Sequence, residues 1–363
     1  MTYPVTLRPD YSGSAARSSE ARATSIAKGL IALARAGGDL TVAEREAKDD
    51  REALNLLQRT ATAPHSSANT TTFNQSIIDY TTDIMGAACA ASAIIRSGAI
   101  KLSFGEAASI WCHGLSGSSA HVGYFGKGSP FRILQFDESK GVSLEAGLRL
   151  GFGVSMTNEL VAHSNAPVVF RAQMSEDVTQ GLEAILLDAN PGVAALRPAG
   201  LLYNVQTVAA EGTLTGVDAM AADLAGLAAA VGTIGGEIIY VANIKEVTKI
   251  RARMPLFSGV YSSAAVSAGS LIAIAPRGLA FAGSIDGPRI DTSSQTSFVG
   301  DDALVAQQMS ASGSPNTVMA PAYSAFQADL SIVRMILPDL TWGQRVPAGT
   351  GGCVAALTGT IKW

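Results

Sequence analysis

The chain has 363 residues, enough for one large domain or two of ordinary size with a buried core. Only 15% of its residues are charged, against about a quarter in an average soluble protein, so few charges are available to cover a solitary globule. The formal net charge of −4 excludes a strongly basic nucleic-acid binder that works by neutralising phosphates.

Cysteine usage and hydropathy indicate synthesis in a reducing cytoplasm. Cys89, Cys112 and Cys353 are too scattered for a disulfide framework or for a CxxC metal cage. The first residues contain no apolar stretch, so we expect no secretory signal. The apolar run at 84–95 is shorter than the ~18 residues that span a bilayer, and prolines make residues 254–276 a poor membrane helix. We therefore predict no transmembrane segment.

The N-terminal sixth of the chain differs from the rest in charge. Of the first 60 residues 17 are charged, whereas the remaining 303 residues contain only 13% charged side chains. Within it, Ile26, Leu30 and Leu33 recur at helical spacing and stop at Gly37 and Gly38, which predicts a helix. Its apolar stripe is narrow, so we expect this helix to lie against a neighbour.

A second helix is predicted after the glycines. Thr41 and Glu44 have the spacing of a capping box, and Leu54 and Leu57 would lie on its apolar face. Residues 61–72 are rich in Ser and Thr and are typical of a linker.

The next segments combine an apolar run, a loop and a predicted hairpin. The pattern at 73–95 fits either a helix or another buried apolar segment, and residues 114–128 are Gly- and Ser-rich, which indicates a loop. Two strand-like runs, 131–136 and 142–153, flank a turn at 137–141 and predict a β-hairpin. Because apolar and polar residues alternate in it, one face needs a covering partner.

The strongest helical pattern follows the hairpin. Asn165 and Pro167 are start signals, and residues 190–192 end the pattern. Its apolar face comprises Met174, Val178, Leu182 and Ile185. Roughly two dozen residues make a rod of about 35 Å, which we expect to act as a scaffold element.

The second half of the chain begins as an α/β unit and continues with strands and turns. We predict a strand at 201–208, a helix at 217–231 and a strand at 237–242. The helix would point Met220, Leu224 and Leu227 inward. Near the end, 330–337 and 352–363 are predicted strands around residues 342–345. No repeat of 20–50 residues is present, which excludes solenoids and propellers.

The motifs that could carry chemistry are incomplete. His113 and Ser116 suggest a serine hydrolase, but the nucleophile elbow needs Gly-x-Ser-x-Gly between a strand and a helix, whereas Ser116 lies in a predicted loop. This enzyme remains an alternative from a different functional class.

The candidate zinc and phosphate sites also depart from the known sequence patterns for such sites. A zinc set of Cys112, His113, His121 and His163 matches no common ligand spacing. Lys127, with glycines at 123, 126 and 128, is followed by Gly where a Walker loop needs Ser or Thr. The adjacent pairs Asp49–Asp50 and Asp301–Asp302 do not converge on one point, and we expect them to be solvated. The sequence predicts no catalytic, cofactor or metal site.

Four groups of strings, in this order, resemble the major capsid proteins of tailed bacteriophages, the Hong Kong ninety-seven type of shell protein. They are Tyr124–Phe131 with Phe136 and Leu144; Val154–Leu160 with Ser164; Leu186–Ala189 with Pro198–Leu201; and Phe326–Arg334 with Trp342 and Gly359–Trp363. In the second string three residues separate Ser155 from Glu159, where the family has one. The strings cover 73–363, and the charged helices before them match the family only loosely.

The resemblance implies an α+β fold with a long spine helix at about 166–189, peripheral and axial domains, an extended hairpin loop and an N-terminal helical arm. The implied segments are an arm at 1–72, the N-terminal part of the body at 73–124, the extended loop at 125–152, the peripheral domain at 153–210, the axial domain at 211–324 and returning C-terminal strands at 325–363.

The implied function is self-assembly. Pentamers and hexamers would close an icosahedral shell around double-stranded DNA that is packaged without sequence specificity, in a virion assembled in the bacterial host cytoplasm. Portal, scaffolding and decoration proteins would be partners, with no membrane, cofactor or enzymatic activity. Candidate inter-subunit contacts are Phe131, Ile133, Phe136, Lys140 and Leu144. An encapsulin-type shell with enzyme cargo is the alternative within the same fold.

Overall fold

The computed structural model has a mixed α+β architecture, as the sequence predicts. It describes residues 12–50, 52–54, 56–57, 77–86, 89–105, 107–114, 127, 141–163, 165–231, 236–284, 288–295, 297–298, 323–345 and 352–363. The helices are α1 (Ser12–Arg35), α2 (Leu40–Glu46), α4 (Ile77–Met85), α5 (Ala90–Arg96), α6 (Asn158–Ala162), α7 (Ala166–Leu186), α8 (Gly216–Val231) and α9 (Ile244–Arg253), with a 3-10 turn at Pro276–Gly278.

The strands form several separate sheets. They are β1 (Ile100–Ser103), β2 (Ser109–His113), β3 (Gly141–Glu145), β4 (Arg149–Thr157), β5 (Gln206–Ala209), β6 (Ile239–Ala242), β7 (Val260–Ser262), β8 (Leu271–Ile274), β9 (Leu279–Gly283), β10 (Arg289–Ser293), β11 (Ser297–Phe298), β12 (Tyr323–Ser324), β13 (Leu330–Pro338), β14 (Thr341–Gln344) and β15 (Val354–Thr358). Their orders are β1-β9-β14, β10-β13-β4, β11-β12, β5-β15-β8-β6-β7 and β2-β3.

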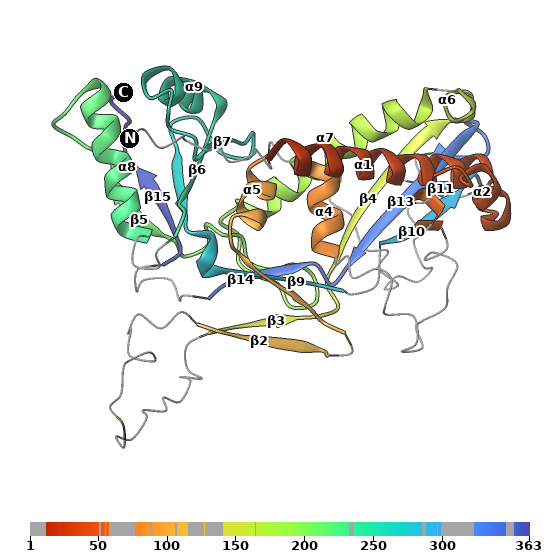
Figure 1. Ribbon diagram of the computed structural model, residues 1–363, viewed down its shortest axis with the longest axis horizontal. Coiled ribbons are helices and arrows are strands. Elements are labelled where there is room, and N and C mark those ends of the chain that lie inside the picture. The colour runs from red at the N-terminus through yellow and green to blue at the C-terminus, as the bar shows by residue number, and fades with distance from the viewer. Residues whose placement is uncertain are drawn as a thin grey trace, which may run out of the picture.

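Two lobes share one continuous apolar core (Figure 1). In the larger lobe, α1 and α7 lie side by side across the antiparallel sheet β10-β13-β4. The second lobe contains the five-stranded sheet with α8 and α9. Between them, β1, β9 and β14 form a small sheet, beneath which β2 and β3 pack as a separate antiparallel pair.

Helix α7 confirms the predicted scaffold helix. It has 21 residues, about 31 Å at 1.5 Å per residue, and it ends a few residues before the predicted 189. Met174, Val178 and Leu182 are buried, as expected, and Ile185 is partly buried. The helix begins after Asn165, whose side chain makes no capping hydrogen bond, with Pro167 in the first turn.

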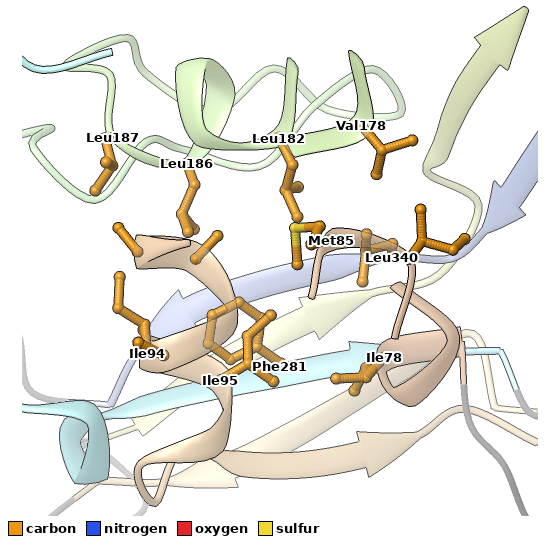
Figure 2. Packing of buried hydrophobic residues seen from close by; sticks show 14 of the residues in the cluster. Ile78, Met85, Ile94, Ile95, Val178, Leu182, Leu186, Leu187, Phe281 and Leu340 are labelled. Atoms are coloured by element: carbon orange, nitrogen blue, oxygen red, sulfur yellow. The ribbon is translucent and has the colours of Figure 1, made fainter. Parts of the chain in front are cut away.

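The segment 73–95, which the sequence left open, contains two helices, α4 and α5. Figure 2 shows the apolar face of α7 directed toward both helices and toward the small sheet. The labelled side chains are Val178, Leu182, Leu186 and Leu187 at the α7 end, Ile78 and Met85 of α4, Ile94 and Ile95 of α5, Phe281 and Leu340. The spine helix therefore anchors the centre of the core.

A buried carboxylate links this centre to the second lobe. Glu183 of α7 accepts hydrogen bonds from the backbone N–H of Ala91, at the start of α5 (3.2 Å), and from the hydroxyl of Ser263, just after β7 (2.6 Å). Because hydrogen bonds to a charged acceptor are strong and a buried unpaired carboxylate is costly, this contact constrains how the two lobes meet.

The neighbour expected for the N-terminal helix is the spine helix of the same chain. Ile26, Leu30 and Leu33 are buried against it, and the helix stops before Gly37 and Gly38, as predicted. Its C-terminal end is held by Arg35, which donates to backbone carbonyls around α6. The described part of this helix thus belongs to the main core.

The predicted capping box is wrong. The N-cap of α2 is Asp39, whose carboxylate accepts from the Thr41 hydroxyl and from the backbone N–H groups of Thr41 and Val42. These hydrogen bonds, led by that of the Thr41 hydroxyl, lower the pKa of Asp39. Thr41 lies inside the helix, because Asp39 already satisfies the free N–H groups at its start.

The predicted strand at 142–153 is also wrong, because it is two strands that pair with different partners. β3 pairs with β2 and β4 pairs with β13. The break lies at Gly147, whose φ of +95° is unfavourable for other residues, and the carboxylate of Asp339 accepts its N–H. The predicted hairpin partner, 131–136, lies outside the described residues.

In the second half the predicted helix is confirmed, the predicted strands are confirmed only in part, and α9 was not predicted. α8 matches the predicted 217–231, with Met220, Leu224 and Leu227 buried. The strand predicted at 201–208 begins only at Gln206, because residues 201–204 form turns. Residues 341–344, expected to lie between strands, are themselves strand β14.

The sheets also group segments that are far apart in sequence. β15, from the C-terminal segment, lies between β5 and β8 in the second lobe. β9 and β10, which belong to the segment 211–324, instead pair in the two sheets outside that lobe. The second lobe thus consists mainly of residues 206–275 and 352–363.

A core substitution tests whether the N-terminal helix belongs to the body. Leu30→Ala should lower the free energy of unfolding by about 2–5 kcal/mol, because Leu30 of α1 is fully buried in the main core. Leu256→Ala is the control, since this side chain is 98% exposed. Chemical denaturation of both variants measures the difference, and equal stability for the two would contradict the packing of α1.

Candidate inter-subunit surface

The pair β2 and β3 forms a ribbon with one packed face and one open face. Cys112 and Leu144 point into a small apolar cluster with Ala280 and Ala282 of β9. On the opposite face Trp111 is 44% exposed. The sequence pattern predicted that one face of a hairpin would need a covering partner, and the open face of the ribbon matches this expectation. The strand that pairs with β3 is β2.

The loop that follows the spine helix, which we call the spine-end loop (residues 187–204), is built around one carboxylate. Asp188 accepts two hydrogen bonds from the guanidinium of Arg197, at 2.6 and 2.8 Å, and further ones from the backbone and side-chain N–H groups of Asn190. Gly200 packs directly on Asp188. Only glycine fits there, because a Cβ would collide with the carboxylate and the backbone oxygen of Asp188. The loop is therefore held in one conformation.

The core holds this loop from a second side. The indole N–H of Trp342 donates to the carbonyl of Ala199, and the Gln344 amide donates to the carbonyl of Leu201, both at 3.0 Å. The outward side of the loop carries Val193 and Leu196, and Leu196 is 65% exposed. A rigid loop that presents apolar side chains to solvent is suited to packing against another surface.

An open groove of about 480 Å³ lies between the ribbon and the spine-end loop. β3 lines it with Val142, Ser143 and Glu145, and β14 lines it with residues 341–344. The opposite wall is the spine-end loop. Because the walls come from three separate parts of the chain, the groove depends on the tertiary packing of the ribbon.

Other large apolar side chains are exposed away from the groove, on both lobes. They are Val42, Leu160, Val168, Val169, Leu214, Val217, Ile244, Leu256 and Phe326. Single exposed apolar residues are ordinary in soluble proteins. The groove and its rim differ from them because they combine exposed apolar groups with a rigid backbone.

Of the five predicted contact residues, the structure places Leu144. It is 1% exposed and packs on its own chain beneath the ribbon. The other four lie outside the described residues: Phe131, Ile133, Phe136 and Lys140. That these five residues contact a neighbouring subunit therefore stays a prediction.

The structure describes only part of the hydrolase pair and of the zinc set. His113 ends β2, and Ser116 lies outside the described residues. Cys112 and His113 are adjacent in one strand, so their side chains point to opposite faces. His121 is also outside the described part, and His163 follows α6 at the end of α1, where its carbonyl accepts from Arg35. Among the described residues, no three His, Cys, Asp or Glu side chains gather as a metal site would require.

The remaining polar candidates have other surroundings. Lys127 is an exposed turn residue. Asp50, expected to be solvated, instead binds the Ser25 hydroxyl, the Lys28 ammonium and the backbone N–H of Ala53. Burial raises its pKa, but these hydrogen bonds outweigh that effect and leave the pKa lowered. Asp301 and Asp302 lie outside the described residues.

Cys89 and Cys353 are in surroundings that suppress thiolate chemistry. Burial raises the pKa of Cys353 to about 12 and that of Cys89 to about 11. Both are free thiols, as is the buried Cys112. A thiol with so high a pKa is a poor nucleophile at neutral pH, so neither Cys353 nor Cys89 is a candidate catalytic residue.

The residues that shape this surface were mostly not identified from the sequence. Trp111 lies in β2 (Ser109–His113), where burial alternates along the strand but Ile110, Trp111 and Cys112 are consecutive apolar residues that show no such alternation in the sequence. Asp188 and Gly200 lie within strings that carried the resemblance, but their contact could not be inferred from their spacing. Among the described residues, no helix has the length and hydropathy of a membrane span.

No family model matches the chain, and no curated protein matches it in sequence. Solved structures do match it. A structure titled Mycobacterium phage Bobi has a TM-score of 0.48 and 11% identity, over 82% of this chain and 95% of its own. The satellite phage P4 procapsid including the size determination protein has a TM-score of 0.44 and 8% identity, over 71% and 93%.

A third match is the holo-SrpI encapsulin complex from Synechococcus elongatus, with a TM-score of 0.42 and 11% identity, over 85% of this chain and 96% of its own. The three titles name a phage, a phage procapsid and an encapsulin.

Two glycine substitutions test whether the spine-end loop is rigid. Gly200→Ala should lower the free energy of unfolding by about 1–3 kcal/mol, because its Cβ would overlap Asp188. Gly181→Ala in α7 is the matched control: its Cβ would meet nothing within 4 Å, so it should stabilise the helix by roughly 0.5–1 kcal/mol. Thermal or chemical unfolding measures both changes. A neutral Gly200→Ala variant would show that the loop yields easily.

Proposed function

We propose that this chain is a phage major capsid protein, which assembles through pentamers and hexamers into an icosahedral shell around double-stranded DNA. The observation that carries the proposal is the order of parts along the chain. After the N-terminal helices come the strands of the ribbon, then a 21-residue spine helix, then a lobe with a five-stranded sheet, and then a long strand that returns to the first lobe. The sequence resemblance implies these parts in this order.

Contacts between distant strings support the proposal. Asn158, in the second string, donates to Asp329 and accepts from Ser331, both in the fourth string. The two halves of the third string meet at Asp188 and Gly200, and Trp342 of the fourth string binds Ala199. Strings that are scattered in the sequence therefore lie together in two clusters, as expected if they specify one common fold.

The surface has the character that a shell subunit needs. Few charges are available over residues 61–363, and the rigid spine-end loop presents apolar groups to solvent. Interface centres are depleted in charge, so a subunit enclosed by its own copies can carry little. The slightly acidic balance also suits a container that must not grip DNA tightly.

In this proposal the second lobe is the axial domain, and the larger lobe with α7 is the peripheral domain. The extended loop was predicted at 125–152, and the part of it that the structure describes, residues 141–152, belongs to β3 and β4. In this proposal the loop is therefore restricted to the segment between β2 and β3. Residues 1–72 are the arm, of which α1 packs on the body. Portal, scaffolding and decoration proteins would be partners, and assembly would take place in the host cytoplasm. The chain itself would have no catalytic role.

Electron microscopy of the purified full-length chain is the direct test. We expect rings, sheets or closed shells at high protein concentration, because each subunit offers complementary edges to its copies. Monomers or small oligomers alone, over a range of salt and concentration, would refute the shell function. Nuclease-protected DNA in particles from the native source supports a phage capsid, whereas particles that hold only protein cargo would assign the encapsulin function instead.

A loop replacement tests the role of the ribbon in assembly. Replacing residues 116–139 by a short Gly/Ser linker keeps both strands and the buried Leu144, so the subunit should fold and unfold at a temperature close to that of the unchanged chain. Closed shells should be lost, since the proposed contact with the neighbouring subunit is removed. Sedimentation and microscopy measure the outcome. Normal shells from this variant would contradict an essential contact there.

A further inference from the structure

The open end of the ribbon, which we call the ribbon root, comprises Trp111, His113, Gly141 and Arg345. His113 and Gly141 face each other as the last paired residues of β2 and β3. The chain leaves β2 after this pair and returns to β3 at it. A contact at this pair therefore acts on the orientation of both strands of the ribbon.

Arg345 holds this root from a different sheet. Its guanidinium donates to the carbonyl of His113 through Nε, at 2.8 Å, and to the carbonyl of Arg277 through an Nη, at 3.1 Å. Its own backbone N–H donates to the carbonyl of Gly278, at 2.8 Å. One residue after β14 thus binds both the ribbon and the turn before β9.

The two hydrogen bonds of the Arg345 guanidinium fix the orientation of the ribbon root as well as its distance from the body. The guanidinium is a planar fork, so donating two hydrogen bonds to two carbonyls defines an angle as well as a distance. Both acceptors are backbone atoms, so the contact acts on the path of the main chain. Because the backbone of Arg345 is itself bound to Gly278, the fork has a fixed origin.

The other side of the root is packed tightly enough to transmit this orientation. A Cβ on Gly141 would lie 2.6 Å from the carbonyl of Cys112 and 2.6 Å from the Trp111 ring. The indole of Trp111 therefore covers Gly141 closely, and its ring also lies 5.7 Å from that of His113. Because the two strands are paired and packed at this position, a contact that holds His113 also restrains Gly141.

We propose that Arg345 is a positioning residue for assembly: it fixes the orientation of the open end of the β2–β3 ribbon on the body of the subunit and so determines whether copies close into a shell. The inference rests on the proposed shell function. It adds a residue outside the ribbon that governs the geometry of the inter-subunit contact without being part of it.

The experiment compares Arg345→Ala with Arg35→Ala. Arg35 is a matched control, because it also donates two hydrogen bonds to backbone carbonyls, those of Val161 and His163, at 2.9 Å each, far from the ribbon. Both variants should lose a similar amount of thermal stability. Arg345→Ala should give at least about tenfold fewer closed shells or shells of irregular diameter, while Arg35→Ala should assemble like the unchanged chain.

Each result bears on a definite statement. Equal assembly by Arg345→Ala and the unchanged chain would overturn this inference and leave the shell function intact. An equal assembly defect in both variants would also overturn it, because general destabilisation would then explain the loss. Absence of shells from the unchanged chain would instead refute the proposed function itself.

A conservative variant keeps the inference testable if Arg345→Ala does not fold. Arg345→Lys retains the positive charge but replaces the fork by a single ammonium, which is not matched to both carbonyls at once. We expect a folded subunit with a reduced yield of regular shells. Faster hydrogen exchange at residues 109–113 and 141–145, with no change over β13 and β4, would support a local effect on the root. A yield and diameter like those of the unchanged chain would contradict the role of the fork.

Discussion

Burial of one apolar face of α7 is the constraint on which the rest of the molecule depends. Met174, Val178 and Leu182 face inward, toward α1, α4 and α5, and the hydrophobic effect makes this packing the main stabilising term. Glu183, one residue further along, lies at the junction with the second lobe. The same helix therefore orders the large lobe and, at its C-terminal end, limits how the second lobe attaches to it.

The C-terminal end of α7 also leads directly into the candidate surface. Asp188 follows the helix within two residues and holds Arg197 and Gly200, while Trp342 binds the loop from the sheet below. The ribbon lies against that sheet. The position of the groove thus depends on the helix through a short, well-bonded path.

The candidate site is a surface whose role depends on shape and on few charges. The described members of the candidate hydrolase and zinc sets have structural contacts instead: Cys112 is buried under the ribbon, and the carbonyl of His113 accepts from Arg345. The features that remain are rigid: a carboxylate-centred loop and a ribbon root held by an arginine fork. Rigid, weakly charged edges are what repeated contacts between identical subunits require.

The sequence by itself determined the helices well, because helical periodicity is local. The spine helix, α8 and the end of α1 at its two glycines all follow from residues within a few turns of each other. It also determined the low charge of the body and the strings that carry the resemblance to capsid proteins. The capping box failed for a local reason, since Asp39 lies two residues before Thr41 and competes for the same N–H groups.

Strand pairing and the candidate surface were decided only by the tertiary structure. The run at 142–153 alternates like one strand, yet Gly147 and the distant Asp339 divide it between two sheets. β15 enters the second lobe from the end of the chain, and Arg345 reaches His113 across more than two hundred positions of sequence. Hydrogen bonds between strands and to backbone carbonyls carry no signature in the spacing of residues, because any amide or carbonyl can make them. Which segments meet is therefore settled by packing of the whole core.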